Sequence, residues 1–188
     1  MSIRSRLFSL PIPRLLRKVF LMRLFRLTAG AFGAPAPRVR GTPAQILDSY
    51  SAFTKEQAER VMQDSSRVAE VQRGLFAHAS SLGARLRSSL GVSSTGEAME
   101  VARALYRLID VDFSGTAAPG SCDAGCASGT SACFTVSRCS FSACYPPAVC
   151  RLISSLDAGL LAGLTRGGKM IFTQRITEGA SACKGVVQ

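Results

Sequence analysis

The sequence predicts an α+β fold in which N-terminal helices are followed by a small antiparallel sheet with a packed C-terminal helix. Three observations support this prediction. Apolar residues recur at helical spacing before residue 110, the composition changes to Gly, Ser, Ala, Thr and Cys after Phe113, and a second apolar helical segment lies between two strand-like segments. With 188 residues, 47% of them apolar, the chain can bury one core.

Helix-start signals place the N-terminal helices. Thr42-Pro43-Ala44-Gln45 has the form of a capping box with proline at the first helical position, and Thr54–Gln57 repeats the pattern. We expect a helix over residues 55–73 that continues or restarts through Leu90. Its core face consists of apolar residues spaced three, four and seven apart: Val61, Val68, Val71, Leu75, Leu82 and Leu86. A third helix is expected over residues 96–109, capped by Ser94 and Glu97.

The second half of the chain begins with turn-forming residues. Residues 114–131 predict a loop, either mobile or serving as a lid. Residues 132–138 and 169–177 predict strands, and the last residues follow a Glu-Gly turn as a short final segment. The intervening helix starts at Pro146-Pro147 and ends at Gly167-Gly168. Its Gly159 and Gly163 favour a close approach to the sheet.

Positive charge is concentrated at the N-terminus. The net charge is +11, and residues 1–47 hold nine of the 23 basic residues and none of the 12 acidic residues. We therefore divide the chain into a basic extension and linker, residues 1–41, and a single α+β domain, residues 42–188. Because the body is nearly balanced in charge, we expect no nucleic-acid partner.

The extension has three interpretations. It is an organelle-targeting segment, a surface segment in weak contact with anionic membranes, or an arm that packs on the body. Arginines interrupt its apolar residues, which argues against secretion, and no stretch of about eighteen apolar residues is free of charge. The expected location is the cytoplasm, with an organelle as the alternative.

Seven cysteines and one histidine limit the metal chemistry. Six cysteines lie within residues 122–150, but their spacing fits neither a zinc ribbon nor the common iron–sulfur motifs. We expect reduced thiols, no metal and no cofactor. His78 lies among apolar helical residues, so we expect it to be a core or boundary residue.

The C-terminal module carries the chemistry. On a helical wheel at 100° per residue, Asp157 falls on the apolar face of its helix, on the same side as Cys150. A carboxylate there must be paired, protonated or directed into a polar pocket. Arg175, on the following strand, either forms a structural ion pair with Asp157 or faces a cavity and binds a substrate carboxylate.

The order of Cys139, Tyr145, Cys150, Asp157-Ala158-Gly159, Phe172, Glu178-Gly179 and Cys183 resembles the L-2-amino-thiazoline-4-carboxylic acid hydrolase family. The helix, strand and late cysteine also resemble V4R ligand-binding domains. However, Gly179-Ala-Ser-Ala-Cys183-Lys-Gly lacks the aromatic residue that usually closes the V4R pattern.

The first resemblance implies a hydrolase that opens a cyclic amidine at a carbon–nitrogen or carbon–sulfur bond. The roles it implies are a nucleophile or base at Cys150 or Cys139, a proton donor at Asp157 or Glu178, and substrate binding by Arg175 and Tyr145. The V4R resemblance implies a non-catalytic small-molecule-binding or sensor domain instead. Under either interpretation the expected partner is a small carboxylate-bearing ligand, and the residues themselves give no independent sign of turnover.

Overall fold

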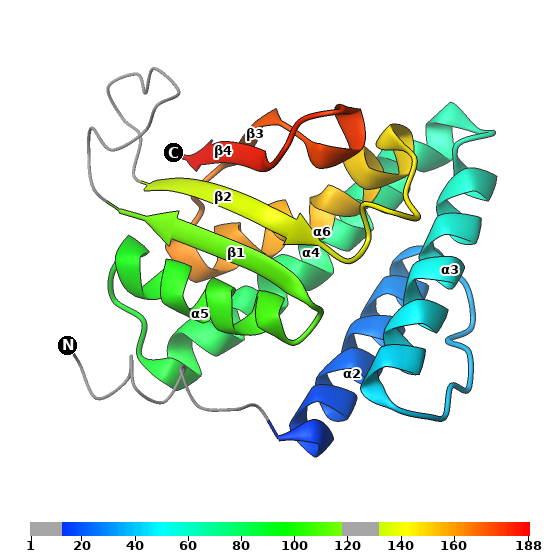
Figure 1. Cartoon of the computed structure of the whole chain (residues 1–188), viewed down its shortest axis with the longest axis horizontal. Helices are drawn as coiled ribbons and strands as arrows, with labels where there is room; N and C mark the ends of the chain where they lie inside the picture. Colours follow the sequence, from blue (N-terminus) through cyan, green and yellow to red (C-terminus); the bar gives the residue numbers. More distant parts are fainter. Residues whose placement is uncertain (1–12, 118–131) are drawn as a thin grey trace.

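The computed structural model describes residues 13–117 and 132–188 and confirms the α+β class (Figure 1). Four helices come first: α2 (Arg14–Ala31), α3 (Pro43–Val61), α4 (Ser65–Leu90) and α5 (Thr95–Arg107). The remaining elements are β1 (Val111–Thr116), β2 (Ala132–Cys139), α6 (Pro147–Thr165), β3 (Met170–Gln174), the short 3₁₀ helix η1 (Ile176–Glu178) and β4 (Cys183–Val187).

The four strands form one antiparallel sheet in the order β1-β2-β4-β3. In Figure 1, α4 and α6 lie behind this sheet, α5 lies beside β1, and α2 and α3 stand together at one end. Buried aromatic rings join strands to helices, since Phe113 of β1 stacks on Tyr106 of α5 with ring centroids 4.7 Å apart. One face of the sheet and the helices therefore share a core.

Two of the three predicted capping boxes are present. Thr42 caps α3 with Gln45, and Ser94 caps α5 with Glu97. The expected helix start at Thr54 is wrong, because Thr54 is buried within α3 and its hydroxyl donates to the Tyr50 carbonyl. The chain instead breaks after Val61, and the Asp64 side chain caps α4.

The strand prediction is confirmed for β2. The strand predicted over residues 169–177 is too long, because β3 ends at Gln174, Arg175 lies just after it and residues 176–178 form η1. Strand β1 was not predicted. Its residues alternate between buried and exposed positions, and Gly115 lies where a Cβ atom would approach the Met99 sulfur to 2.9 Å. A glycine next to Ser114 reads as a turn in the sequence, whereas here it permits close packing on α5. The rest of the predicted loop, residues 118–131, lies outside the described residues.

Helix α6 packs most closely on α4, not on the sheet as predicted from its glycines. A Cβ atom at Gly163 would lie 2.2 Å from the Ser80 carbonyl oxygen, and one at Gly159 would lie 2.3 Å from that of Phe76. A Cβ atom at Gly83 of α4 would be equally confined, 2.4 Å from the Leu160 carbonyl oxygen.

Among the described helices, α6 alone is long and apolar enough to cross a membrane, and half of it is buried inside the protein.

Helix α2 places part of the basic extension in the core. Leu21 and Phe25 are fully buried and pack with Ile46, Leu47 and Tyr50 of α3. The outer face of α2 is exposed, and the boundary at residue 41 stays a prediction. His78 is exposed on α4, where its Nδ1 lies 3.3 Å from the Leu27 carbonyl oxygen of α2. It is therefore a boundary residue between these two helices and not a core residue.

Candidate functional site

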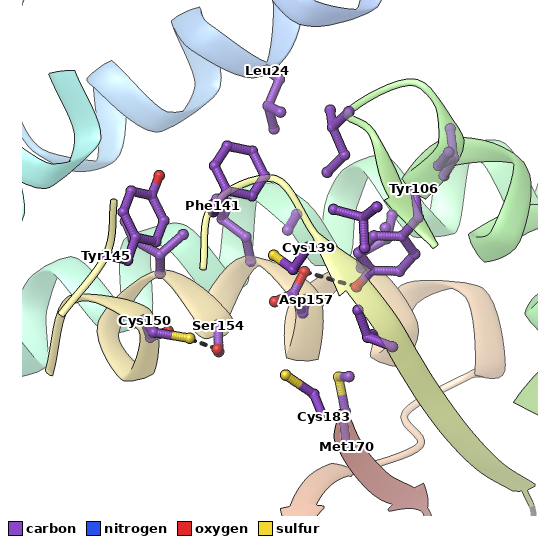
Figure 2. Close-up of a pocket in the computed structure, with 18 of the residues that line it drawn as sticks. Leu24, Tyr106, Cys139, Phe141, Tyr145, Cys150, Ser154, Asp157, Met170 and Cys183 are labelled. Carbon is purple, nitrogen blue, oxygen red and sulfur yellow. Dashed lines mark hydrogen bonds between the residues drawn. The ribbon is translucent and has the colours of Figure 1, made fainter. Parts of the chain in front are cut away.

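A cavity of about 130 Å³ lies between α6, the ends of the strands and the inner face of α2 (Figure 2). Most of its lining is apolar. Side chains from α2, α5, α6, the sheet and the turns after α5 and β2 contribute, including Leu24, Leu105, Ile109, Val136, Phe141, Ile153, Leu160 and Met170. The polar groups on its walls are few, which is the usual composition of a small-molecule site.

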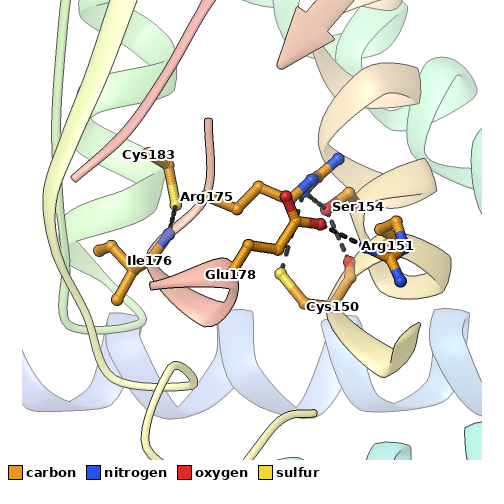
Figure 3. A network of polar contacts seen from close by, with 7 residues as sticks. All are labelled: Cys150, Arg151, Ser154, Arg175, Ile176, Glu178 and Cys183. Atoms are coloured by element: carbon orange, nitrogen blue, oxygen red, sulfur yellow. Dashed lines mark hydrogen bonds and ion pairs between the residues drawn. The ribbon is translucent and has the colours of Figure 1, made fainter. Parts of the chain in front are cut away.

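Five of the six residues predicted for the site line this cavity: Cys139, Tyr145, Cys150, Asp157 and Arg175. Glu178 does not. Its carboxylate forms an ion pair with Arg151 on the exposed side of α6 (Figure 3). The structure therefore brings together a carboxyl, a guanidinium and thiols from elements that are distant in sequence.

Asp157 is held by Tyr106. The Tyr106 hydroxyl donates to Asp157 Oδ1 over 2.7 Å (Figure 2). Burial raises the pKa of Asp157 to about 6, although the Tyr106 hydrogen bond and the positive charge of Arg175 act in the opposite direction. At neutral pH this carboxyl is therefore ionised but close to its protonation point.

The sequence predicted Arg175 or a bound ligand as the partner of Asp157, but the structure shows a different partner. No ion pair within 4.0 Å joins Asp157 to Arg175 or to another basic side chain of the described residues. The observed partner, Tyr106, comes from α5 and lies 51 residues before Asp157. A tyrosine on the apolar face of a predicted helix was the available signal, because a buried hydroxyl needs a partner.

Arg175 is oriented by neutral groups (Figure 3). Its Nη1 donates to Ser154 Oγ over 2.7 Å and lies 3.9 Å from Cys150 Sγ. The guanidinium also stacks on Phe172, 3.8 Å from the ring centroid. Ser154 was missed by sequence reasoning, although it lies four residues after Cys150 and three before Asp157 on the same helix.

The cavity thiols differ in environment. Burial raises the pKa of Cys139 to about 12 and also raises the pKa of Cys183, whose sulfur accepts the Ile176 amide over 3.3 Å. Cys139 is therefore protonated at neutral pH and is a poor nucleophile. Cys150 is the thiol that lies beside a guanidinium.

The expectation of reduced thiols holds for Cys139, Cys144, Cys150 and Cys183. It is wrong for Cys133, which is disulfide-bonded. Within residues 13–117 and 132–188, no three His, Cys, Asp or Glu side chains are grouped closely enough to hold a metal ion.

Tyr145 contributes its ring and not its hydroxyl. The hydroxyl is hydrogen-bonded to Thr54 of α3, and the ring stacks on Phe141 with centroids 5.3 Å apart. A ligand would therefore meet an aromatic surface at this wall.

Comparisons of the chain with models of protein families, with curated proteins and with solved structures found no match. The functional interpretation therefore depends on the geometry of the cavity.

Proposed function

We propose that this protein binds a small molecule in the cavity lined by Asp157 and Arg175. One observation carries the proposal: two groups of opposite charge line the same apolar cavity without forming an ion pair with each other. Charged groups are costly to keep unpaired in apolar surroundings. A ligand with complementary groups would pair with both.

The cavity size and its two charges define the ligand class. A volume of about 130 Å³ is close to that of a cavity known to hold benzene, so the ligand has about one ring. Arg175 suits a carboxylate, and Asp157 suits a cation or a hydrogen-bond donor. A cyclic amidine carboxylate carries both groups, in agreement with the resemblance to the thiazoline-carboxylate hydrolases.

Hydrolysis is the second candidate function, and the pKa of Asp157 favours it. A carboxyl with a pKa of about 6 can act as general acid or base near neutral pH. In this reaction water would add to the amidine carbon, the ring bond from that carbon to sulfur or nitrogen would break, and Asp157 would protonate the departing atom. In a covalent variant of this reaction Cys150, beside Arg175, would attack the amidine carbon first, because Cys139 holds its proton. The ring bond would break as Asp157 protonates the departing atom, and water would then cleave the bond between Cys150 and that carbon and restore the thiol.

The test compares two probes and two variants. Calorimetry with 2-amino-thiazoline-4-carboxylate should show binding by the wild type, and Arg175→Met should weaken it by about tenfold or more. The same variant should bind 2-aminothiazoline, which lacks the carboxylate, as the wild type does. Arg151→Met, which removes one surface charge from the same region, is the matched control and should leave both affinities unchanged.

Failure of the wild type to bind either probe contradicts this ligand class. Mass spectrometry of the mixture separates the two candidate functions. Ring-opened product that depends on Asp157 supports hydrolysis, and binding without product supports the non-catalytic, V4R-like interpretation.

A further inference from the structure

We propose that the outer face of α2 docks on the surface of an anionic lipid bilayer. The inference is independent of the cavity ligand and starts from exposure. Leu15, Leu16 and Val19 are 74%, 55% and 58% exposed, which makes them the three most exposed large apolar residues of the described chain. Three such side chains within two turns of one helix form an apolar patch that soluble surfaces usually avoid.

The position of these residues on α2 explains their exposure. At 100° per residue, the buried Leu21, Phe25 and Thr28 point to one side of the helix. The three apolar residues point to the opposite side and continue into Arg23 and Arg26, which are both exposed. The outer face of α2 is therefore apolar at its N-terminal end and basic further along.

The charge of this face indicates which kind of partner binds it. Residues 1–47 contain nine basic residues and no acidic one, and Arg23 and Arg26 form no ion pair with the described residues. A second copy of the chain would bring arginines against arginines. A nucleic acid would satisfy the arginines but would leave the leucines without apolar contacts. An anionic bilayer supplies phosphate groups and an apolar layer beneath them.

The fold supports this docking mode. The inner face of α2 is fixed on α3 and α4, so the helix presents its outer face already folded and need not order on binding. Leu24 on the inner side also lines the cavity, so docking through the outer face would leave the cavity wall intact.

Flotation of the full chain with vesicles tests the proposal. The wild type should bind phosphatidylcholine vesicles containing about 30% phosphatidylserine and should bind pure phosphatidylcholine at least about tenfold more weakly. The triple variant Leu15→Ser/Leu16→Ser/Val19→Ser should lose at least about tenfold in partitioning to the anionic vesicles. Leu90→Ser, at another exposed apolar residue, is the matched control and should partition like the wild type.

A second pair of variants tests the basic part of the face. Arg23→Gln/Arg26→Gln should reduce partitioning by about fivefold or more per arginine, whereas Arg73→Gln/Arg85→Gln, with the same charge change on α4, should have a smaller effect. All four positions are exposed, so circular dichroism should show unchanged folding. Absence of wild-type binding to anionic vesicles would overturn the proposal. So would binding that survives the triple serine variant, because the charge of the chain alone would then account for it.

Discussion

At the residue scale, the site is defined by two charged side chains that do not pair with each other. Tyr106 holds Asp157, and Ser154 and Phe172 hold Arg175. Each charge is thus oriented by neutral groups and keeps its remaining hydrogen-bonding capacity for the cavity. This arrangement differs from a structural ion pair, in which the two charges would satisfy each other.

The raised pKa of Asp157 predicts a pH-dependent stability. The pKa is about 6 in the folded protein, above the ordinary value of 3.8, so the folded state binds the proton more tightly. The contribution of Asp157 to the free energy of unfolding is therefore fully present below about pH 4. It decreases by roughly 3 kcal/mol as the pH rises from there through 6. Urea unfolding of the wild type and of Asp157→Asn between pH 4 and 7.5 measures the difference.

The asparagine variant should gain stability relative to the wild type as the pH rises, because it keeps an acceptor for Tyr106 without the buried charge. If the difference in unfolding free energy between the two proteins is the same at every pH, Asp157 has an ordinary pKa in the folded protein and its carboxyl is not desolvated.

Sequence reasoning predicted much of this site and missed its hydrogen-bond partners for a physical reason. Cys150 and Asp157 could be found because a polar residue on an apolar helix face is visible in one helical period. Arg175 could be found because it lies in the segment that follows this helix and was expected to pack against it. The contact between Tyr106 and Asp157 joins two helices separated by β1 and β2, and no local pattern reports such a contact. Glu178 was predicted to lie in the site, but its carboxylate pairs with Arg151 outside the cavity. Its position after a strand does not determine which way its side chain points.

At the element scale, the fold depends on the contact between α4 and α6. Glycines on both helices let the two backbones approach each other, and α6 then carries Cys150, Ser154 and Asp157 to the cavity wall. The contact between α4 and α6 thus sets the position of the site. From the glycines of α6, the sequence had predicted a close contact of this helix with the sheet instead.

Gly163→Ala should destabilise the protein by about 2 to 3 kcal/mol, since its Cβ atom would overlap the Ser80 carbonyl oxygen and force the helices apart. Gly74→Ala on α4 is the control. Its Cβ atom would lie at an ordinary 3.5 Å from that of Ala31, and alanine favours the helix, so this variant should be neutral or up to about 1 kcal/mol more stable. Equal melting temperatures for the two variants would show that the helices tolerate separation.

Helix α2 offers a second test at this scale. Phe25→Ala should cost about 3 to 5 kcal/mol, because the ring is fully buried against Tyr50 and Phe53. Chemical unfolding measures the cost, with Val19→Ala on the outer face as a control that should change stability by less than about 0.5 kcal/mol. A neutral Phe25→Ala would support the domain boundary at residue 41, since α2 would then be dispensable.

At the scale of the whole molecule, the helices and the sheet enclose a cavity whose walls come from both halves of the chain. Sequence periodicity predicted the α+β class because helices and strands have different apolar periods. It could not predict β1, whose Ser-Gly-Thr ending reads as a turn, nor the share of α2 in the cavity wall, which depends on tertiary packing. The same helix presents the proposed membrane face on its outer side.

Proton release on binding tests the central claim that Asp157 faces the ligand. Calorimetry of 2-amino-thiazoline-4-carboxylate at pH 6, in two buffers with different ionisation enthalpies, counts the protons exchanged on binding. If the amidine group pairs with the Asp157 carboxylate, binding will keep it ionised, and about half a proton will be released per wild-type complex. Asp157→Asn should release none. Binding with equal proton exchange in both proteins, or no binding to the wild type, would contradict the account.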